Sequence, residues 1–281
     1  MVIALGTEQE LYRGKIIDSH VHFKPDNDYF NRIAEASGYE NTLAALETAC
    51  AENNMTNAIL MDGDNTGRYA NLSPNLRYCL GINEDAVRLD TKAPVIDSFE
   101  HHMRSPSCVG IKIFAGYIQR DLMDGVFTPL YELARQYDKP IAIHTGQTSR
   151  SNAGLEHCHP LMLDKVAVNY PDITFIMCHF GNPWFQDAAA VLEKNSNVYA
   201  DLSGILVGKL DVDIYMQKKS GYVNYLKTWL AYVDDYSRFM YGTDWPLCNI
   251  GDYIQFISRI IPEQHHYKVF YENAKNVYKT A

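Results

Sequence analysis

Short apolar runs recur along the chain, and between them apolar and polar residues alternate with helical spacing. Eight of the runs are rich in β-branched and aromatic residues and end near Gly, Pro or Asn, which is typical of strands buried on both faces. The expected strands cover residues 15–23, 57–63, 77–83, 108–115, 140–146, 173–180, 197–203 and 238–245. The stretches between them predict helices at 41–54, 128–138, 160–171, 187–197 and 222–235.

Strands that alternate with helices predict an α/β fold with a parallel sheet. Eight strands, most of them followed by a helix, favour a single (β/α)₈ TIM barrel over residues 1–281. A doubly wound open sheet is the alternative, because the number of strands does not show that a sheet closes. The second and third strands lie too close in sequence for a full crossover helix, so we expect a short or irregular connection there.

Composition excludes several classes of protein. The chain has 281 residues, of which 47% are hydrophobic and 21% charged, which is ordinary for a globular protein. A net charge of −9 argues against a nucleic-acid binder. The six cysteines form no C-x-x-C pair, so we expect reduced, buried thiols. No apolar run approaches the ~20 residues of a membrane helix, and the first apolar stretch is too short for a signal peptide. These features predict a cytoplasmic protein with no membrane partner.

Polar residues follow several of the apolar runs where the expected strands end. His20 and His22 lie two residues apart in "IIDSHVHF", so on a strand both imidazoles would share a face and could reach one metal ion. The runs "IAIHTG", "IMCHFG" and "YGTDWP" end in the same way, with His144, His179 and Asp244. A single histidine at a strand end is more often a structural group than a ligand. Because barrel strands end at one mouth, however, we expect all five groups to converge there and to hold a metal.

Two further polar residues belong to these strands. Lys112 interrupts "VGIKIFAG" in the middle of the fourth expected strand, and a lysine inside a barrel is unfavourable unless it is paired. It could bind a substrate anion, pair with a strand-end carboxylate, or bridge two metal ions as a carbamylated side chain. Asp18 begins the D-x-H-x-H stretch, and we expect it to orient a metal-binding imidazole without touching the metal.

Several motifs together resemble a known family. They are "IIDSHVHF", "GIKIF", "IAIHTG", "LMLDKVAVNYPDITFIMCHFGNPW", "NVYADLSG", "YGTDWP" and "FYENAKNVYK". By their order and spacing along nearly the whole chain, the sequence resembles the amidohydrolase-related branch of the amidohydrolase superfamily. This resemblance implies a distorted TIM barrel that holds one or two divalent metal ions, often zinc.

The resemblance also implies roles for individual residues. By motif position, the metal ligands would be His20, His22, His144 and Asp244. His179 would contact the substrate and the attacking water, or would bind a second ion. Binuclear relatives use a carboxylated lysine at the end of strand four. Because Lys112 is expected in mid-strand, we expect one ion, zinc or manganese.

The leading functional hypothesis is a metal-dependent hydrolase that cleaves an amide, ester or lactone. In this hypothesis Asp244 takes the proton of the water and His179 polarises the scissile carbonyl. The alternative within the family is a non-oxidative decarboxylase of an unsaturated or aromatic carboxylic acid. A non-catalytic ligand-binding barrel is a third hypothesis, which the presence of all five strand-end groups disfavours.

The substrate and the partners are less defined by the sequence. Lys112, Trp184 and Arg68 are expected to contact the substrate, which the positive charges suggest is a small molecule bearing a carboxylate. Relatives are often dimers or larger oligomers, so the resemblance implies a homodimer.

Overall fold

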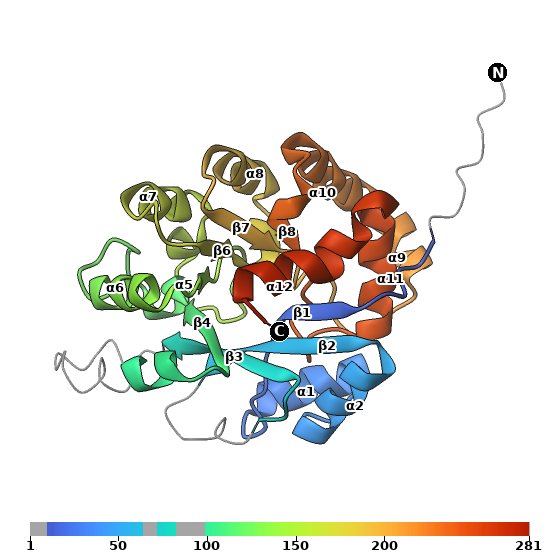
Figure 1. The fold of residues 1–281 in the computed structure, drawn as a ribbon. Coiled ribbons are helices and arrows are strands. Elements are labelled where there is room, and N and C mark those ends of the chain that lie inside the picture. The colour runs from blue at the N-terminus through green and yellow to red at the C-terminus, as the bar shows by residue number, and fades with distance from the viewer. Residues whose placement is uncertain (1–9, 64–71, 83–98, 281) are drawn as a thin grey trace.

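Eight parallel strands form one sheet in which each strand pairs with the next along the chain (Figure 1). The structure is a computed structural model that describes residues 10–63, 72–82 and 99–280. The strands are β1 (Ile16–Val21), β2 (Met55–Gly63), β3 (Leu76–Ile82), β4 (Cys108–Ile113), β5 (Ile141–Ile143), β6 (Phe175–Met177), β7 (Val198–Asp201) and β8 (Phe239–Met240). All eight expected strands are present.

Backbone contacts between the first and last strands bring the two edges of the sheet together. The amide of Ser19 donates to the carbonyl of Tyr241 at 3.0 Å, and the amide of His22 donates to the carbonyl of Trp245 at 2.6 Å. A parallel bridge joins Val21 to Trp245. The sheet is therefore a nearly closed TIM barrel, and the open-sheet alternative is wrong.

The last four strands are shorter than the sequence pattern predicts. The expected strands 140–146, 173–180 and 238–245 shrink to the two or three residues of β5, β6 and β8. In each case the chain turns through the left-handed region just beyond the strand, at Gly146 (φ 89°), His179 (φ 62°) and Asp244 (φ 63°). The polar residues that seemed to end these strands therefore lie in the turns that follow.

Helices surround the barrel, and the five expected ones are present as α2, α6, α7, α8 and α10. The labelled α-helices of the described residues are α1 (Asp28–Ser37), α2 (Leu43–Glu52), α5 (Ala115–Ile118), α6 (Thr128–Tyr137), α7 (Leu161–Asn169), α8 (Phe185–Lys194), α9 (Val212–Lys218), α10 (Ser220–Val233), α11 (Ile250–Ile260) and α12 (Asn273–Tyr278). Residues 99–104 are also helical. The unusual connection expected between the second and third strands falls largely on residues 64–71, outside the described residues.

Apolar side chains fill two layers. A larger cluster lies between the sheet and the helices, and a smaller one fills the barrel interior. The interior cluster combines strand residues such as Ile17, Ile176 and Met240 with Ala274 and Tyr278 of α12. Figure 1 shows α12 across one end of the barrel, so this end is sealed by apolar packing. Buried polar side chains are concentrated at the opposite end of the barrel, where the strands have their carboxyl ends.

Two expectations from composition can be compared with the structure. All six cysteines are buried free thiols, which confirms the prediction. Within residues 10–63, 72–82 and 99–280, no helix is long and apolar enough to cross a bilayer.

Candidate metal centre

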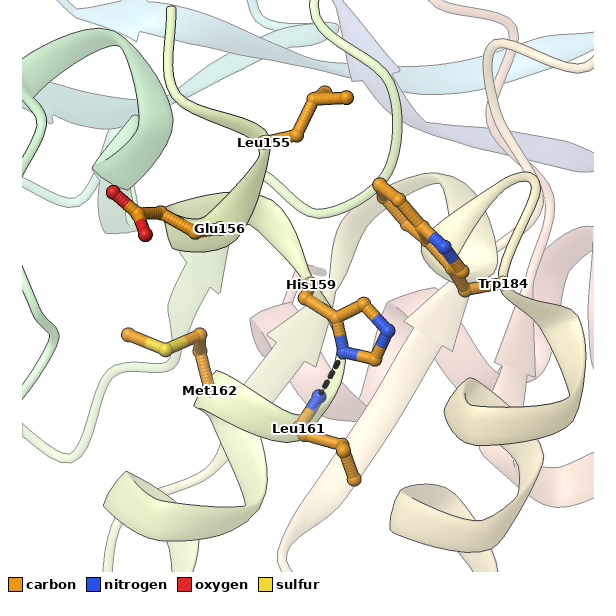
Figure 2. Close-up of a pocket in the computed structure, with 6 residues that line it drawn as sticks. All are labelled: Leu155, Glu156, His159, Leu161, Met162 and Trp184. Carbon is orange, nitrogen blue, oxygen red and sulfur yellow. Dashed lines mark hydrogen bonds between the residues drawn. The ribbon is translucent and has the colours of Figure 1, made fainter.

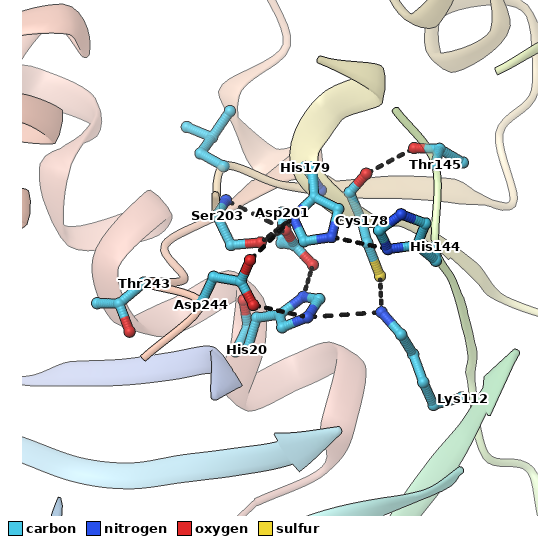
Figure 3. Close-up of polar contacts among 12 residues, drawn as sticks. His20, Lys112, His144, Thr145, Cys178, His179, Asp201, Ser203, Thr243 and Asp244 are labelled. Atoms are coloured by element: carbon cyan, nitrogen blue, oxygen red, sulfur yellow. Dashed lines mark hydrogen bonds and ion pairs between the residues drawn. The ribbon is translucent and has the colours of Figure 1, made fainter. Parts of the chain in front are cut away.

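Three of the expected metal ligands lie together where β1 ends and in the turn after β8 (Figure 3 labels His20 and Asp244). The Nε2 atoms of His20 and His22 are 3.3 Å apart. Oδ1 of Asp244 lies 3.0 Å from Nε2 of His22 and 3.7 Å from Nε2 of His20. One donor atom from each residue lies within 4.8 Å of the other two, so the three could bind one cation.

His144 and His179 extend this cluster from the ends of β5 and β6. Nε2 of His179 is 3.1 Å from Nδ1 of His144, and the ring of His179 lies 4.7 Å from the ring of His20. Nδ1 of His179 is 4.0 Å from Oδ2 of Asp244. His144 thus joins the cluster through His179 and lies outside the three-donor group. Its Nε2 is buried and has no hydrogen-bond partner among the described residues.

Left-handed backbone turns aim these side chains. His179 and Asp244 both have a positive φ, which is uncommon for residues other than glycine and clusters at functional sites. Gly204, at φ 66°, makes room for both residues: a Cβ there would lie 2.8 Å from Nδ1 of His179 and 3.1 Å from Oδ2 of Asp244. The glycine of "NVYADLSG" is therefore required by conformation and by close approach.

Asp201, at the end of β7, is a member of the site that the sequence analysis did not identify. It is fully buried, and its Oδ2 lies 2.9 Å from Nδ1 of His20. Its Oδ1 accepts hydrogen bonds from the amides of His179 (2.8 Å) and Ser203 (3.1 Å). An ionised carboxylate only accepts hydrogen bonds, so Nδ1 of His20 holds the proton and Nε2 keeps its lone pair for a cation. The sequence signal that could have identified Asp201 is the one that identified Asp244, namely a polar residue near the end of an expected strand.

Asp18 acts on the backbone rather than on an imidazole. Its Oδ1 accepts from the amides of His20 (3.1 Å) and Thr243 (3.0 Å), and its Oδ2 accepts from Oγ1 of Thr243 (2.6 Å). These bonds tie β1 to the segment that carries Asp244. Complete burial raises the pKa of Asp18 to about 7, although the hydrogen bonds with Thr243 oppose the shift.

The protonation states of the cluster suit a metal site. Burial and the nearby Lys112 lower the pKa of His20 to about 4, and burial beside His179 lowers the pKa of His144 well below its ordinary value. Burial would raise the pKa of Asp201 and Asp244, but their contacts with histidines hold both below the ordinary value. Neutral imidazoles and ionised carboxylates are the forms that bind metal.

Two features show that the residues fit a divalent cation. Nε2 of His144 is a buried nitrogen that has no hydrogen-bond partner among the described residues. The cluster also contains two ionised carboxylates, those of the fully buried Asp201 and the partly exposed Asp244, with one buried ammonium group, that of Lys112. A divalent ion would more than offset the excess negative charge of these groups, and His144 lies close enough to the cluster to be a further ligand if its side chain moves. Nitrogen and carboxylate oxygen donors suit zinc.

Lys112 is fully buried and lies within β4, as expected, one residue before the end of the strand. Its side chain points into the barrel, where Nζ donates to Sγ of Cys178 at 2.8 Å and lies 3.5 Å from Nε2 of His20. Burial opposes the charge, but Cys178 and Asp201 raise the pKa of Lys112. Cys178, a second residue missed from the sequence, forms a further three-donor group with His20 and Asp201.

Trp184, which was expected to contact the substrate, makes no contact with the cluster among the described residues. Figure 2 shows Trp184 beside His159, with ring centroids 4.9 Å apart, in a pocket of about 430 Å³. That pocket is also lined by Leu155, Glu156, Leu161 and Met162. It lies between the loops that follow β5 and β6. Arg68 lies outside the described residues.

Comparisons with known proteins agree with this architecture. A family model described as "Amidohydrolase" matches residues 17–280. A search of curated proteins gives no match.

Solved structures of similar fold cover nearly the whole chain. A zinc-bound amidohydrolase from Burkholderia multivorans is 15% identical, with a TM-score of 0.66, and the match covers 95% of this chain and 100% of that one. A probable 2-pyrone-4,6-dicarboxylic acid hydrolase from Acinetobacter baumannii is 14% identical (TM-score 0.63; coverage 94% and 99%). A 2,6-dihydroxybenzoate decarboxylase from Rhizobium is 12% identical (TM-score 0.63; coverage 95% and 99%). At these identities the likeness concerns the fold.

We expect the purified protein to hold about one zinc or manganese ion per chain, with the ion lost from His22→Ala and Asp244→Ala, because each change removes a donor of the three-residue group. The measurement is elemental analysis after dialysis. His101→Ala, which changes an exposed histidine, serves as the control and should keep the metal. Full metal content in either ligand variant would contradict the assignment.

Asp201→Asn should weaken zinc binding roughly 10- to 100-fold, because an amide no longer holds Nδ1–H of His20 as a carboxylate does. Competition with a chromophoric chelator measures the affinity. The matched control is Asp164→Asn, which changes a surface partner of Lys194. Equal affinities in Asp201→Asn and wild type would show that Asp201 does not support the metal site.

Proposed function

The chain belongs to the amidohydrolase family, and on that premise we propose that it is a metal-dependent hydrolase that uses water to cleave an amide, ester or lactone. The observation that carries the proposal is the group of three donor atoms from His20, His22 and Asp244, which lie within 4.8 Å of one another at the carboxyl end of the barrel. We propose that His144, which lies next to this group through its contact with His179, is the fourth ligand once its side chain has moved toward the ion. Zinc is the proposed ion, with manganese as the alternative, and one ion is proposed rather than two.

The bound ion would act as a Lewis acid, polarising the substrate and lowering the pKa of a water molecule from 15.7 toward about 7. The two oxygens of Asp244 face different neighbours, since Oδ1 lies 3.0 Å from Nε2 of His22 and Oδ2 lies 4.0 Å from Nδ1 of His179. One oxygen can therefore bind the ion while the other accepts a proton from water and passes it to the leaving group. The role proposed for His179 is to contact the substrate beside Asp244.

Aromatic and basic side chains next to the cluster support a planar substrate that bears a carboxylate. The half-buried ring of Phe114 lies 6.4 Å from the ring of His22 and 6.3 Å from that of His144. The ring of Phe30 lies 5.6 Å from that of His22. Nζ of Lys24 lies 5.2 Å from the centre of the Phe30 ring and 5.7 Å from that of Phe114. We therefore propose Lys24 beside the substrate, in addition to Lys112.

Non-oxidative decarboxylation of an aromatic or unsaturated acid is the second candidate. The same ligands could hold oxygens of such an acid, and the phenyl rings of Phe30 and Phe114 flank His22, where a ring would lie. The Rhizobium decarboxylase of similar fold acts on 2,6-dihydroxybenzoate, a planar carboxylate. The cytoplasmic location and the homodimer expected from the sequence remain predictions.

The two reactions can be separated with zinc-loaded protein and two probes, 2-pyrone-4,6-dicarboxylate and 2,6-dihydroxybenzoate. We expect cleavage of the lactone with incorporation of ¹⁸O from labelled water into the new carboxylate. His179→Asn should keep its metal at saturating zinc and lose roughly 100-fold or more in turnover, as expected for a group that contacts the reacting atoms.

The control for that experiment is His159→Asn, which changes a histidine in the pocket beside Trp184. It should keep the wild-type rate. Release of carbon dioxide from the aromatic acid without lactone cleavage would favour the decarboxylase instead. Inactivity of the metal-loaded protein toward a panel of lactones, esters, amides and acids would favour a binding protein.

A further inference from the structure

Helix α10 has an exposed aromatic face on the outside of the barrel, beside α8 (Figure 1). The ring of Phe185 in α8 lies 6.0 Å from the ring of Tyr225. Tyr225 and Tyr232 are 41% and 56% exposed, and they share one side of the helix because they lie two turns apart. The smaller residues Gly221 and Thr228 are exposed on the same side. Aromatic side chains gathered on one exposed face are typical of an interaction site.

This face is complementary to itself in an antiparallel arrangement. A two-fold axis between residues 226 and 227 would place Tyr232 of one copy opposite Gly221 of the other, and Tyr225 opposite Thr228. Each large side chain would then meet a small residue, so that the two helices could pack closely. Because a two-fold axis repeats every contact, both pairs would occur twice.

Gly221 has a role in this arrangement that a single chain does not give it. It is the second residue of α10, where glycine is a weaker helix former than alanine. A Cβ atom at Gly221 would meet no described atom within 4 Å, and its backbone lies outside the left-handed region that favours glycine. In the antiparallel pair, Tyr232 of the second copy would fill the space next to this residue.

The charges at the two ends of α10 follow the same symmetry. Lys218 and Lys219 precede the helix, and Asp234 and Asp235 follow it; all four are exposed. The same two-fold axis pairs position 218 with 235 and position 219 with 234, so two ammonium groups would face two carboxylates at each end. A parallel pair would instead bring like charges together. Complementary charges of this kind set the orientation of a partner.

We infer that α10 is the centre of a homodimer interface, in which two copies of the helix pack antiparallel about a two-fold axis between residues 226 and 227. A helix of 14 residues is roughly 21 Å long and 10 Å across, so one face offers less than the about 800 Å² that each partner of a stable dimer buries. The adjoining surface of α8 contributes the rest. The inference is independent of the proposed function, because none of the three metal donors lies on α10.

Sedimentation velocity over a range of protein concentrations tests the interface, and the wild type should be a dimer. Gly221→Gln places a side chain where Tyr232 of the second copy would lie, so the Kd of the dimer should rise roughly tenfold or more. The change introduces a better helix former at an exposed position, so the monomer should keep its fold and its melting temperature. Gly125→Gln is the matched control, because Gly125 is also exposed and a Cβ there meets no described atom within 4 Å. It should dimerise as the wild type does.

Charge reversal tests the antiparallel orientation. Lys218→Glu/Lys219→Glu and Asp234→Lys each bring like charges together in their own homodimers, so each should raise the Kd roughly tenfold or more. Asp235 is left unchanged because its side chain accepts from the amide of Ser237. An equimolar mixture of the two variants should form a heterodimer with about the wild-type affinity. In that heterodimer the introduced carboxylates face the introduced ammonium group, and the unchanged charges pair at the other end.

A wild type that remains monomeric at the highest concentration reached would overturn the inference. So would a dimer whose Kd is the same in Gly221→Gln, since the interface would then lie elsewhere. Failure of the mixed charge variants to associate better than either variant alone would overturn the antiparallel pairing.

Discussion

The carboxylate of Asp201 is the buried group that holds His20, His179 and Ser203 together by hydrogen bonds. It lies fully buried at the end of β7 and accepts from the backbone of two residues and from the side chains of His20 and Ser203. An unpaired buried charge would be strongly unfavourable, so the imidazole of His20 must stay in reach with its proton toward the carboxylate. The side of His20 that remains is an unprotonated nitrogen, which is a metal ligand.

A second constraint is the closure of the barrel. His20 lies in β1, His22 directly follows it and Asp244 follows β8, so these donors meet only because β1 and β8 lie side by side. Asp18 reinforces the closure, because its carboxylate binds the amides of His20 and Thr243. The contacts that complete the fold are thus the contacts that assemble the donor group. We infer that weakening the contacts between β1 and the segment after β8 would reduce metal binding before it unfolded the barrel.

Much of the fold could be predicted from the sequence because buried parallel strands leave a strong local pattern. The eight apolar runs gave the right strands, and polar residues after them marked His20, His22 and Asp244, which the structure brings together. The ends of the strands were predicted less well. The left-handed turns at His179 and Asp244 depend on tertiary contacts, such as the space left by Gly204, which no local pattern reveals.

The polar residues that support the ligands were harder to find from the sequence. Asp201 and Ser203 lie in "NVYADLSG", a stretch recognised for its family resemblance, but their importance depends on bonds to strands β1 and β6. The complete burial of Lys112 and the position of Trp184 likewise depend on how neighbouring segments pack.

The most direct test of the metal centre is anomalous diffraction from zinc-soaked crystals at the zinc absorption edge. The account predicts one peak, about 2.0–2.2 Å from Nε2 of His20 and His22, from a ring nitrogen of His144 and from a carboxylate oxygen of Asp244. No peak at this position would contradict the account. So would a peak bound by Cys178 and Asp201, because an ion there would break the bond between Asp201 and His20.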